Sequence, residues 1–129
     1  MESPWIAIVA LLALLQYVFF GLMVGRARGQ YGVDAPATSG HEMFDRVYRV
    51  HQNTLEQLVV FVPALAAFGH FVSPFWGALV GVLYIAGRFV YSAGYRADPA
   101  KRGTGMMMTF VANAVLALGA LIGAALALL

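Results

Sequence analysis

The sequence predicts an all-α integral membrane protein, in which residues 1–129 form a single domain built as a four-transmembrane-helix bundle. The composition is the first sign, because 61% of the residues are hydrophobic and only 11% are charged, whereas soluble domains are about 25% charged. The second is a set of four long apolar stretches at roughly 4–25, 55–72, 74–95 and 105–129. Each approaches the length of about 20 residues that a spanning helix needs.

Helix-start signals are the third sign, since one precedes each apolar stretch. A capping side chain followed by proline, which is favoured at the first helical position, precedes the first, third and fourth stretches. These pairs are Ser3-Pro4, Ser73-Pro74 and Asp98-Pro99. The segment Ser39–Glu42 predicts a capping box for the second helix, which we expect to run from near Ser39 to near Phe71. We expect Lys101 and Arg102 in the first turn of the fourth helix.

The positive charges predict the topology. All eight arginines and lysines lie near the first-to-second or the third-to-fourth connection, and the 70–75 connection and both termini have none. They are Arg26, Arg28, Arg46, Arg49, Arg88, Arg96, Lys101 and Arg102. Because positive residues concentrate in cytoplasmic connections, we expect these two connections in the cytoplasm and both termini on the non-cytoplasmic side.

The second helix should carry a polar face at its cytoplasmic end. Arg46, Arg49, Asn53 and Glu56 are spaced by 3, 4 and 3 residues, which places them within a sector of roughly 80° on a helix. One interpretation is a helix end that extends into water, with an arginine–glutamate pair stabilising it. A short Asn53 and a Glu56 that lie deeper than the arginines favour the other interpretation, a binding site.

A matching stripe is expected on the third helix, where Tyr84, Arg88, Tyr91 and Tyr95 are spaced by 4, 3 and 4 residues. An aromatic belt at the membrane interface is the alternative, but a belt does not need to share one face with an arginine. Together with Glu56 and the cations near the connections, these side chains are typical of a pocket for a small ligand that carries carboxylates and an amine.

Several kinds of chemistry are excluded or disfavoured by composition. The chain has no cysteine, so disulfides, a protein thiolate and cysteine metal sites are excluded, and any thiol must come with a ligand. His41, His51 and His70 are spaced too far apart to form a metal set, so we expect no metal site. A net charge of +2 without a basic tail gives no support to nucleic-acid binding.

Three segments of the chain resemble the MAPEG family, the membrane-associated proteins in eicosanoid and glutathione metabolism. They are ARGQYGVDAP (27–36), FDRVYRVHQNTLEQ (44–57) and GRFVYSAGYRADPAKRG (87–103). The spacing of Arg49, Asn53 and Glu56 matches the most recognisable element of the family, and that of Arg88, Tyr91 and Tyr95 its companion. With four spans, the resemblance covers nearly the whole chain.

The resemblance implies a homotrimer that binds glutathione between neighbouring subunits, near the cytoplasmic side. The implied glutathione-binding residues are Arg28 (with a possible shift to Arg26), Arg49, Asn53, Glu56, Arg88, Tyr91 and Tyr95. Arg102 matches the arginine assigned to thiolate stabilisation in the leukotriene synthase branch, and Tyr91 and Tyr95 are its rivals as catalytic residues. The chain departs from the family pattern at two positions. Gln52 replaces an arginine of the prostaglandin E synthase pattern, and Gln57 replaces a tyrosine of the leukotriene branch. The resemblance therefore does not identify the electrophilic substrate.

The expected function is therefore that of a membrane-embedded glutathione transferase, with glutathione-dependent peroxidase or isomerase activity as further options. It directs the glutathione thiol at lipophilic electrophiles or hydroperoxides that reach it from the membrane lipids. Such an enzyme would serve detoxification, in the cell membrane of a bacterium or the endoplasmic reticulum of a eukaryote. The alternatives are a small four-span transporter and a non-catalytic membrane protein that keeps the fold. A transporter should carry an ionisable residue near the membrane midplane, where the first span offers only Gln16.

Overall fold

The computed structural model describes residues 3–129 as helices joined by short connections. The elements are α1 (Pro4–Tyr31), α2 (Glu42–Phe71), α3 (Pro74–Ala97), the 3₁₀ helix η1 (Pro99–Arg102) and α4 (Gly103–Leu126). Four helices, with η1 and α4 counted together, are long and apolar enough to cross a membrane. Residues 3–129 contain no strand, so the predicted all-α, four-span fold is confirmed.

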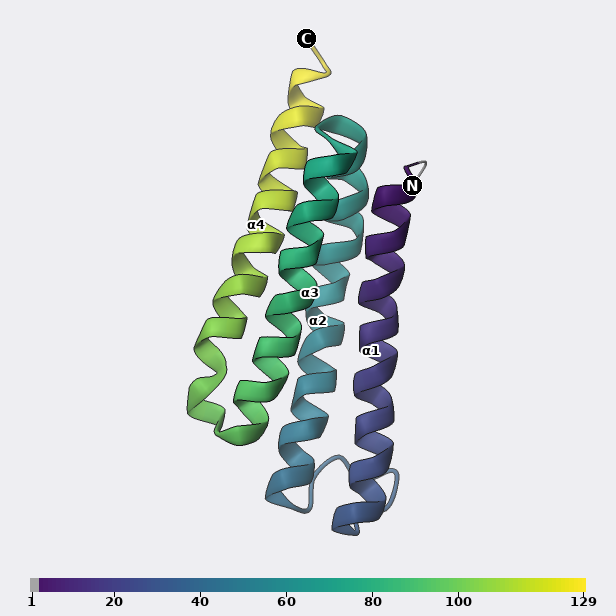
Figure 1. Cartoon of the computed structure of the whole chain (residues 1–129), viewed down its shortest axis with the longest axis vertical. Helices are drawn as coiled ribbons and strands as arrows, with labels where there is room; N and C mark the ends of the chain where they lie inside the picture. The colour runs from purple at the N-terminus through teal and green to yellow at the C-terminus, as the bar shows by residue number, and fades with distance from the viewer. Residues whose placement is uncertain (1–2) are drawn as a thin grey trace.

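The helices pack as an antiparallel bundle with α2 and α3 in its centre (Figure 1). Helix α1 contacts α2 and α3, and α4 contacts the same two helices from another side. The start of α1 and the C-terminus lie at the end of the bundle where α2 turns into α3, called the termini end below, while the α1–α2 connection and η1 lie at the opposite end (Figure 1). The connections rich in arginine and lysine thus share one end, called the charged end below. Which membrane side that end faces remains a prediction.

The start of α2 differs from the prediction, because Ser39 and Glu42 do not form a capping box. Helix α2 begins at Glu42, and His41 is its N-cap residue, whose Nδ1 accepts a hydrogen bond from the Met43 N–H at 3.0 Å. The Ser39 hydroxyl instead donates to the Asp45 carboxylate at 3.1 Å, which also accepts from the Gly40 N–H at 3.1 Å. The glycine has φ +155°, a conformation that other residues rarely adopt, and this turn of the backbone directs Ser39 toward Asp45.

The start of α4 also differs, since Lys101 and Arg102 precede the helix rather than form its first turn. They belong to η1, in which the Lys101 N–H donates to the Asp98 carbonyl three residues earlier at 2.8 Å. Asp98 caps η1, as its carboxylate accepts from the Ala100 N–H at 3.0 Å. This tighter turn reverses the chain, and α4 then packs along α3 from Gly103 onward.

The bundle is apolar both inside and outside, as expected for a protein surrounded by lipid. The core contains the stacked rings of Phe61 and Tyr84, whose centroids are 3.8 Å apart, and fully buried Leu65 and Leu116. Large apolar side chains such as Leu22 and Phe110 point outward, with exposed fractions of 69% and 68%. A water-soluble bundle would instead carry charged side chains on its outer face.

Candidate functional site

The centre of the polar site is Arg88, whose side chain is completely buried. Its Nη2 donates to Asn53 Oδ1 at 2.7 Å and to Thr54 Oγ1 at 3.0 Å, both on α2. Its Nη1 donates to Thr109 Oγ1 on α4 at 3.3 Å. A guanidinium keeps its charge in proteins, so this arginine on α3 holds a permanent positive charge between three helices.

The two threonines are oriented to accept from this arginine. The Thr54 hydroxyl donates its own proton to the Val50 carbonyl at 2.8 Å, and the Thr109 hydroxyl donates to the Gly105 carbonyl at 2.8 Å. Because each hydroxyl proton is used within its own helix, the oxygen lone pairs are left for Arg88.

A carboxylate is linked to the arginine through Asn53. The Asn53 Nδ2 donates to Glu56 Oε1 at 3.3 Å, and Arg49 Nη2 forms a longer ion pair with the same oxygen at 3.8 Å. The side chains of Arg49 and Glu56 are each 50% exposed, whereas Asn53 is buried. The predicted set of Arg49, Asn53 and Glu56 is thus brought together, with its charged pair directed out of the bundle.

The tyrosines of α3 continue the same site toward the charged end. The guanidinium carbon of Arg88 lies 4.3 Å from the centre of the Tyr91 ring, and the Tyr91 ring stacks on Tyr95 with centroids 5.6 Å apart. Tyr91 is 2% exposed, while Tyr95 is half-buried and Arg102 is exposed on η1. The contacts of Arg88, Tyr91 and Tyr95 thus extend the site from the buried guanidinium toward the charged end.

Arg28 lies in a different environment from the other predicted ligands. Its Nη1 donates to the carbonyls of Val33 at 3.3 Å and Ala37 at 2.7 Å, and its guanidinium lies 5.1 Å from the Phe44 ring centre. Within residues 3–129, no hydrogen bond or ion pair joins Arg28 to Arg49 or Glu56. The contacts of Arg28 hold the connection between α1 and α2, and Arg26 is exposed on the last turns of α1.

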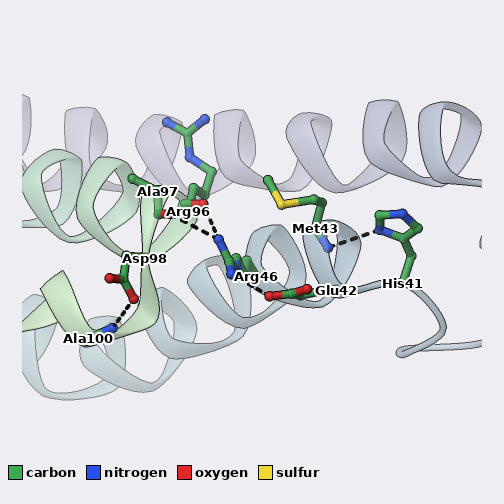
Figure 2. Close-up of polar contacts among 8 residues, drawn as sticks. All are labelled: His41, Glu42, Met43, Arg46, Arg96, Ala97, Asp98 and Ala100. Carbon is green, nitrogen blue, oxygen red and sulfur yellow. Dashed lines mark hydrogen bonds and ion pairs between the residues drawn. The ribbon is translucent and has the colours of Figure 1, made fainter.

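Arg46 joins the charged end of α2 to the end of α3 (Figure 2). Its Nη1 donates to the carbonyls of Arg96 at 3.0 Å and Ala97 at 3.1 Å, and its Nη2 pairs with Glu42 at 2.5 Å. A cation at the carbonyl end of a helix satisfies groups that have no partner within the helix. Although it shares the predicted polar face, Arg46 is therefore engaged in holding two helices together.

The described histidine contacts lie in different parts of the bundle. His51 stacks on the Tyr17 ring with centroids 4.4 Å apart, and His41 stacks on Tyr31 at 4.5 Å. Across residues 3–129, no three histidine, aspartate or glutamate side chains are grouped closely enough to hold a metal ion.

Thr54, Thr109 and Asn113 were not predicted from the sequence, and Gln57 was noted only as a departure from the leukotriene branch. Asn113 Nδ2 donates to Gln57 Oε1 at 3.0 Å between α4 and α2. One signal was available, because Thr109 and Asn113 are four residues apart in an otherwise apolar helix, which places two polar groups on one face.

Comparison with models of known protein families shows to which family the chain belongs. The MAPEG family model matches residues 6–122. The chain belongs to the MAPEG family. With its four apolar helices, this membership identifies it as an integral, multi-pass membrane protein.

Relatives of this MAPEG protein match nearly its whole length. An uncharacterized protein of Synechocystis is 41% identical over 94% of the chain and 88% of the relative. The human protein named microsomal glutathione S-transferase 2 is 36% identical over 95% and 82%. The rat protein named leukotriene C4 synthase is 34% identical over 91% and 82%. The chain therefore spans more than four-fifths of each of these relatives.

Proposed function

We propose that this MAPEG protein is a membrane-embedded glutathione transferase or peroxidase, which activates the glutathione thiol and directs it at lipophilic electrophiles or hydroperoxides. The observation that carries the proposal is the chain of polar contacts Arg49–Glu56–Asn53–Arg88 at the charged end of the bundle, an ion pair followed by two hydrogen bonds. The relatives named glutathione S-transferase and leukotriene C4 synthase support it.

Glutathione matches the charges of this chain of residues. Its ammonium pairs with Glu56, and its two carboxylates pair with Arg49 and the other cations of the charged end. Such charge-assisted hydrogen bonds are stronger than hydrogen bonds between neutral groups. Asn53 and Arg88 orient Glu56 from the interior of the bundle, because the Asn53 amide accepts from the buried guanidinium and donates to the carboxylate. In the proposed homotrimer a neighbouring copy covers Arg49 and Glu56, which face outward from the single bundle.

The proposed chemistry needs a thiolate. A free thiol has a pKa near 8.5, and a neighbouring cation lowers it. Arg102 supplies that cation, with the hydroxyls of Tyr91 and Tyr95 as the alternative donors. The thiolate sulfur then forms a bond to an electrophilic carbon, and the displaced electron pair leaves with the leaving group or is protonated. In the peroxidase case two glutathiones become a disulfide while the hydroperoxide is reduced to an alcohol and water.

The binding part of the proposal is tested with purified protein in detergent by isothermal titration with glutathione. Glu56→Ala should weaken binding by about 1.5–3 kcal/mol, the range for a hydrogen bond to a charged group. Asp34→Ala is the matched control, because it also removes a carboxylate but from the exposed α1–α2 connection, and it should bind as the wild type does. Wild-type affinity in a folded Glu56→Ala variant would remove Glu56 from the site.

A turnover assay beside this titration separates the enzyme from the four-span transporter and the non-catalytic protein. A glutathione enzyme binds glutathione and consumes it with chlorodinitrobenzene or cumene hydroperoxide, at rates that fall in Glu56→Ala. Binding without consumption of glutathione with either probe would contradict the enzymatic proposal while leaving the binding site in place.

A further inference from the structure

A second polar site lies between α2 and α4, one helical turn beyond the Arg88 partners Asn53 and Thr109. Asn113 is only 7% exposed. Its Nδ2 donates to Gln57 Oε1 at 3.0 Å, but its own Oδ1 is buried and has no hydrogen-bond partner within residues 3–129. Burying an amide oxygen without a partner is costly, so this acceptor points to a ligand or a structural role that the bundle alone does not fulfil.

The two amides can form only one hydrogen bond with each other in this arrangement, and the remaining groups define what they can bind. The Asn113 oxygen stays available as an acceptor and the Gln57 NH₂ as a donor. If both amides are turned over, Gln57 supplies the acceptor and Asn113 the donor. In either case the pair offers a ligand one NH₂ group as donor and one amide oxygen as acceptor. A hydroxyl group, which both donates and accepts, satisfies both, whereas an ether or a carbonyl satisfies only the donor.

An apolar groove lies between α2 and α4 about one helical turn beyond this amide pair, toward the termini end. It is lined by Val60 and Ala64 of α2 and by Ala117 and Ala120 of α4. These positions lie three and seven residues after Gln57, and four and seven after Asn113, so each set shares a helix face with its amide. The alanines leave room for an apolar chain, and the amides lie beyond the end of the groove that is nearer the charged end.

The position of the pair relates it to the proposed glutathione site. Gln57 follows Glu56 directly and lies four residues, about one helical turn, after Asn53. A molecule with a hydroxyl at the amides and its apolar chain in the groove therefore has its hydroxyl-bearing end on the side of the charged end.

We infer that Gln57 and Asn113 form a hydroxyl-recognition site, which selects lipophilic substrates that carry a hydroxyl group at the head of an unbranched apolar chain. The inference rests on the proposed function for the reaction but not for the binding. A site built to hydrogen-bond a hydroxyl discriminates strongly against the analogue that lacks it, because its own polar groups are then left unpaired. The competing explanation is an interhelical amide bond with only a packing role.

Binding is tested without glutathione, so that failure of the proposed chemistry cannot hide the result. The melting temperature of the protein in detergent is measured with 4-nonanol and with nonane. The alcohol should stabilise the wild type more than the alkane does, and this preference should disappear in the Gln57→Leu/Asn113→Leu double variant. Gln52→Leu is the matched control, since it makes the same change on α2 and Gln52 has no side-chain hydrogen bond within residues 3–129, and it should keep the preference.

Selectivity is tested with glutathione and two enals that differ by one group, 4-hydroxy-2-nonenal and 2-nonenal. The thiolate sulfur adds to the β-carbon of either enal, the double-bond electrons move to the carbonyl oxygen, and a proton is added at the α-carbon. The ratio of the two kcat/KM values, corrected for the ratio of uncatalysed rates, should favour the hydroxy compound by about tenfold or more. It should fall toward one in the double variant.

Two results would overturn the hydroxyl site. One is an equal effect of alcohol and alkane on wild-type stability, whatever the activity. The other is an alcohol preference that persists in the folded double variant, or in both single leucine variants if the double variant does not fold. An alcohol preference lost in the variants, with neither enal conjugated, would support the site and contradict the proposed reaction instead.

Discussion

At the residue scale, Arg88 and the Arg49–Glu56 pair differ in how far they depend on a ligand. Arg88 is completely buried and has protein acceptors on two other helices, whereas Arg49 and Glu56 are half-exposed and paired at 3.8 Å. The resemblance to the family assigned all three to glutathione, and nothing in the sequence separates them. The difference arises from Thr54 and Thr109, which approach Arg88 only when α2 and α4 pack against α3.

Arg88→Leu should lower the melting temperature even without glutathione. The substitution leaves Asn53 Oδ1 without its 2.7 Å partner, and an unsatisfied buried acceptor costs about 1–3 kcal/mol. Arg49→Ala removes an exposed arginine instead and should weaken glutathione binding with little change in the ligand-free melting temperature. If Arg88→Leu leaves the ligand-free melting temperature unchanged and only abolishes binding, Arg88 acts as a direct ligand.

Arg102→Ala should raise the pKa of the bound glutathione thiol, because a cation near the sulfur stabilises the thiolate. Arg102→Lys should raise it less, since a point charge remains. The ultraviolet absorbance of the thiolate, followed against pH with glutathione bound, measures both shifts. An unmoved titration in Arg102→Ala together with a shift in Tyr95→Phe or Tyr91→Phe would assign the role to that tyrosine.

At the element scale, hydropathy and capping signals predicted the four helices and the starts of α1 and α3, although the Ser3 side chain forms no capping hydrogen bond. Ser73 caps α3 as expected, with its hydroxyl oxygen accepting from the Trp76 N–H at 3.2 Å. The misplaced start of α2 and the 3₁₀ turn before α4 depend on backbone geometry, namely the positive φ of Gly40 and the approach of α4 to α3. A pattern of side-chain types contains neither piece of information.

The contact between α3 and α4 depends on Gly105. A Cβ atom at this position would overlap the backbone of Tyr91, whereas a Cβ at Gly103 would have no atom within 4 Å. Gly105→Ala should therefore destabilise the protein by about 1–3 kcal/mol or more and displace Tyr91, with a loss of glutathione affinity. The control Gly103→Ala should leave the free energy of unfolding unchanged or raise it by up to about 1 kcal/mol, as measured by unfolding in detergent. Equal stabilities of the two variants would contradict this close approach.

At the scale of the whole molecule, the α1–α2 connection and η1 lie at one end of the bundle and the α2–α3 turn at the other (Figure 1). Hydropathy and positive charge were enough to predict this arrangement, because both act over whole segments rather than single contacts. The amide pair Gln57–Asn113 was not predicted, since the partner of each amide lies on a different helix, 56 residues away.

Single cysteines test the topology without background labelling, because the chain has none of its own. Cysteines introduced at Ala37 and Ala100 should be labelled from the cytoplasmic side, and a cysteine at Val72 only from the opposite side. All three positions are exposed and lie outside α1, α2, α3 and α4. Labelling of Val72→Cys from the same side as Ala37→Cys would overturn the four-span arrangement.

The burial of Arg88 has a consequence for how the chain is assembled in the membrane. A guanidinium that enters hydrocarbon on an isolated α3 costs at least about 2.5–3.5 kcal/mol. Its first acceptors, Asn53 and Thr54, belong to the helix that is synthesised just before it. Helices α2 and α3 therefore enter the bilayer most easily as a hairpin, already hydrogen-bonded to each other. Helix α4, which brings Thr109, then completes the burial of Arg88, so the order of synthesis matches the order in which this charge finds its partners.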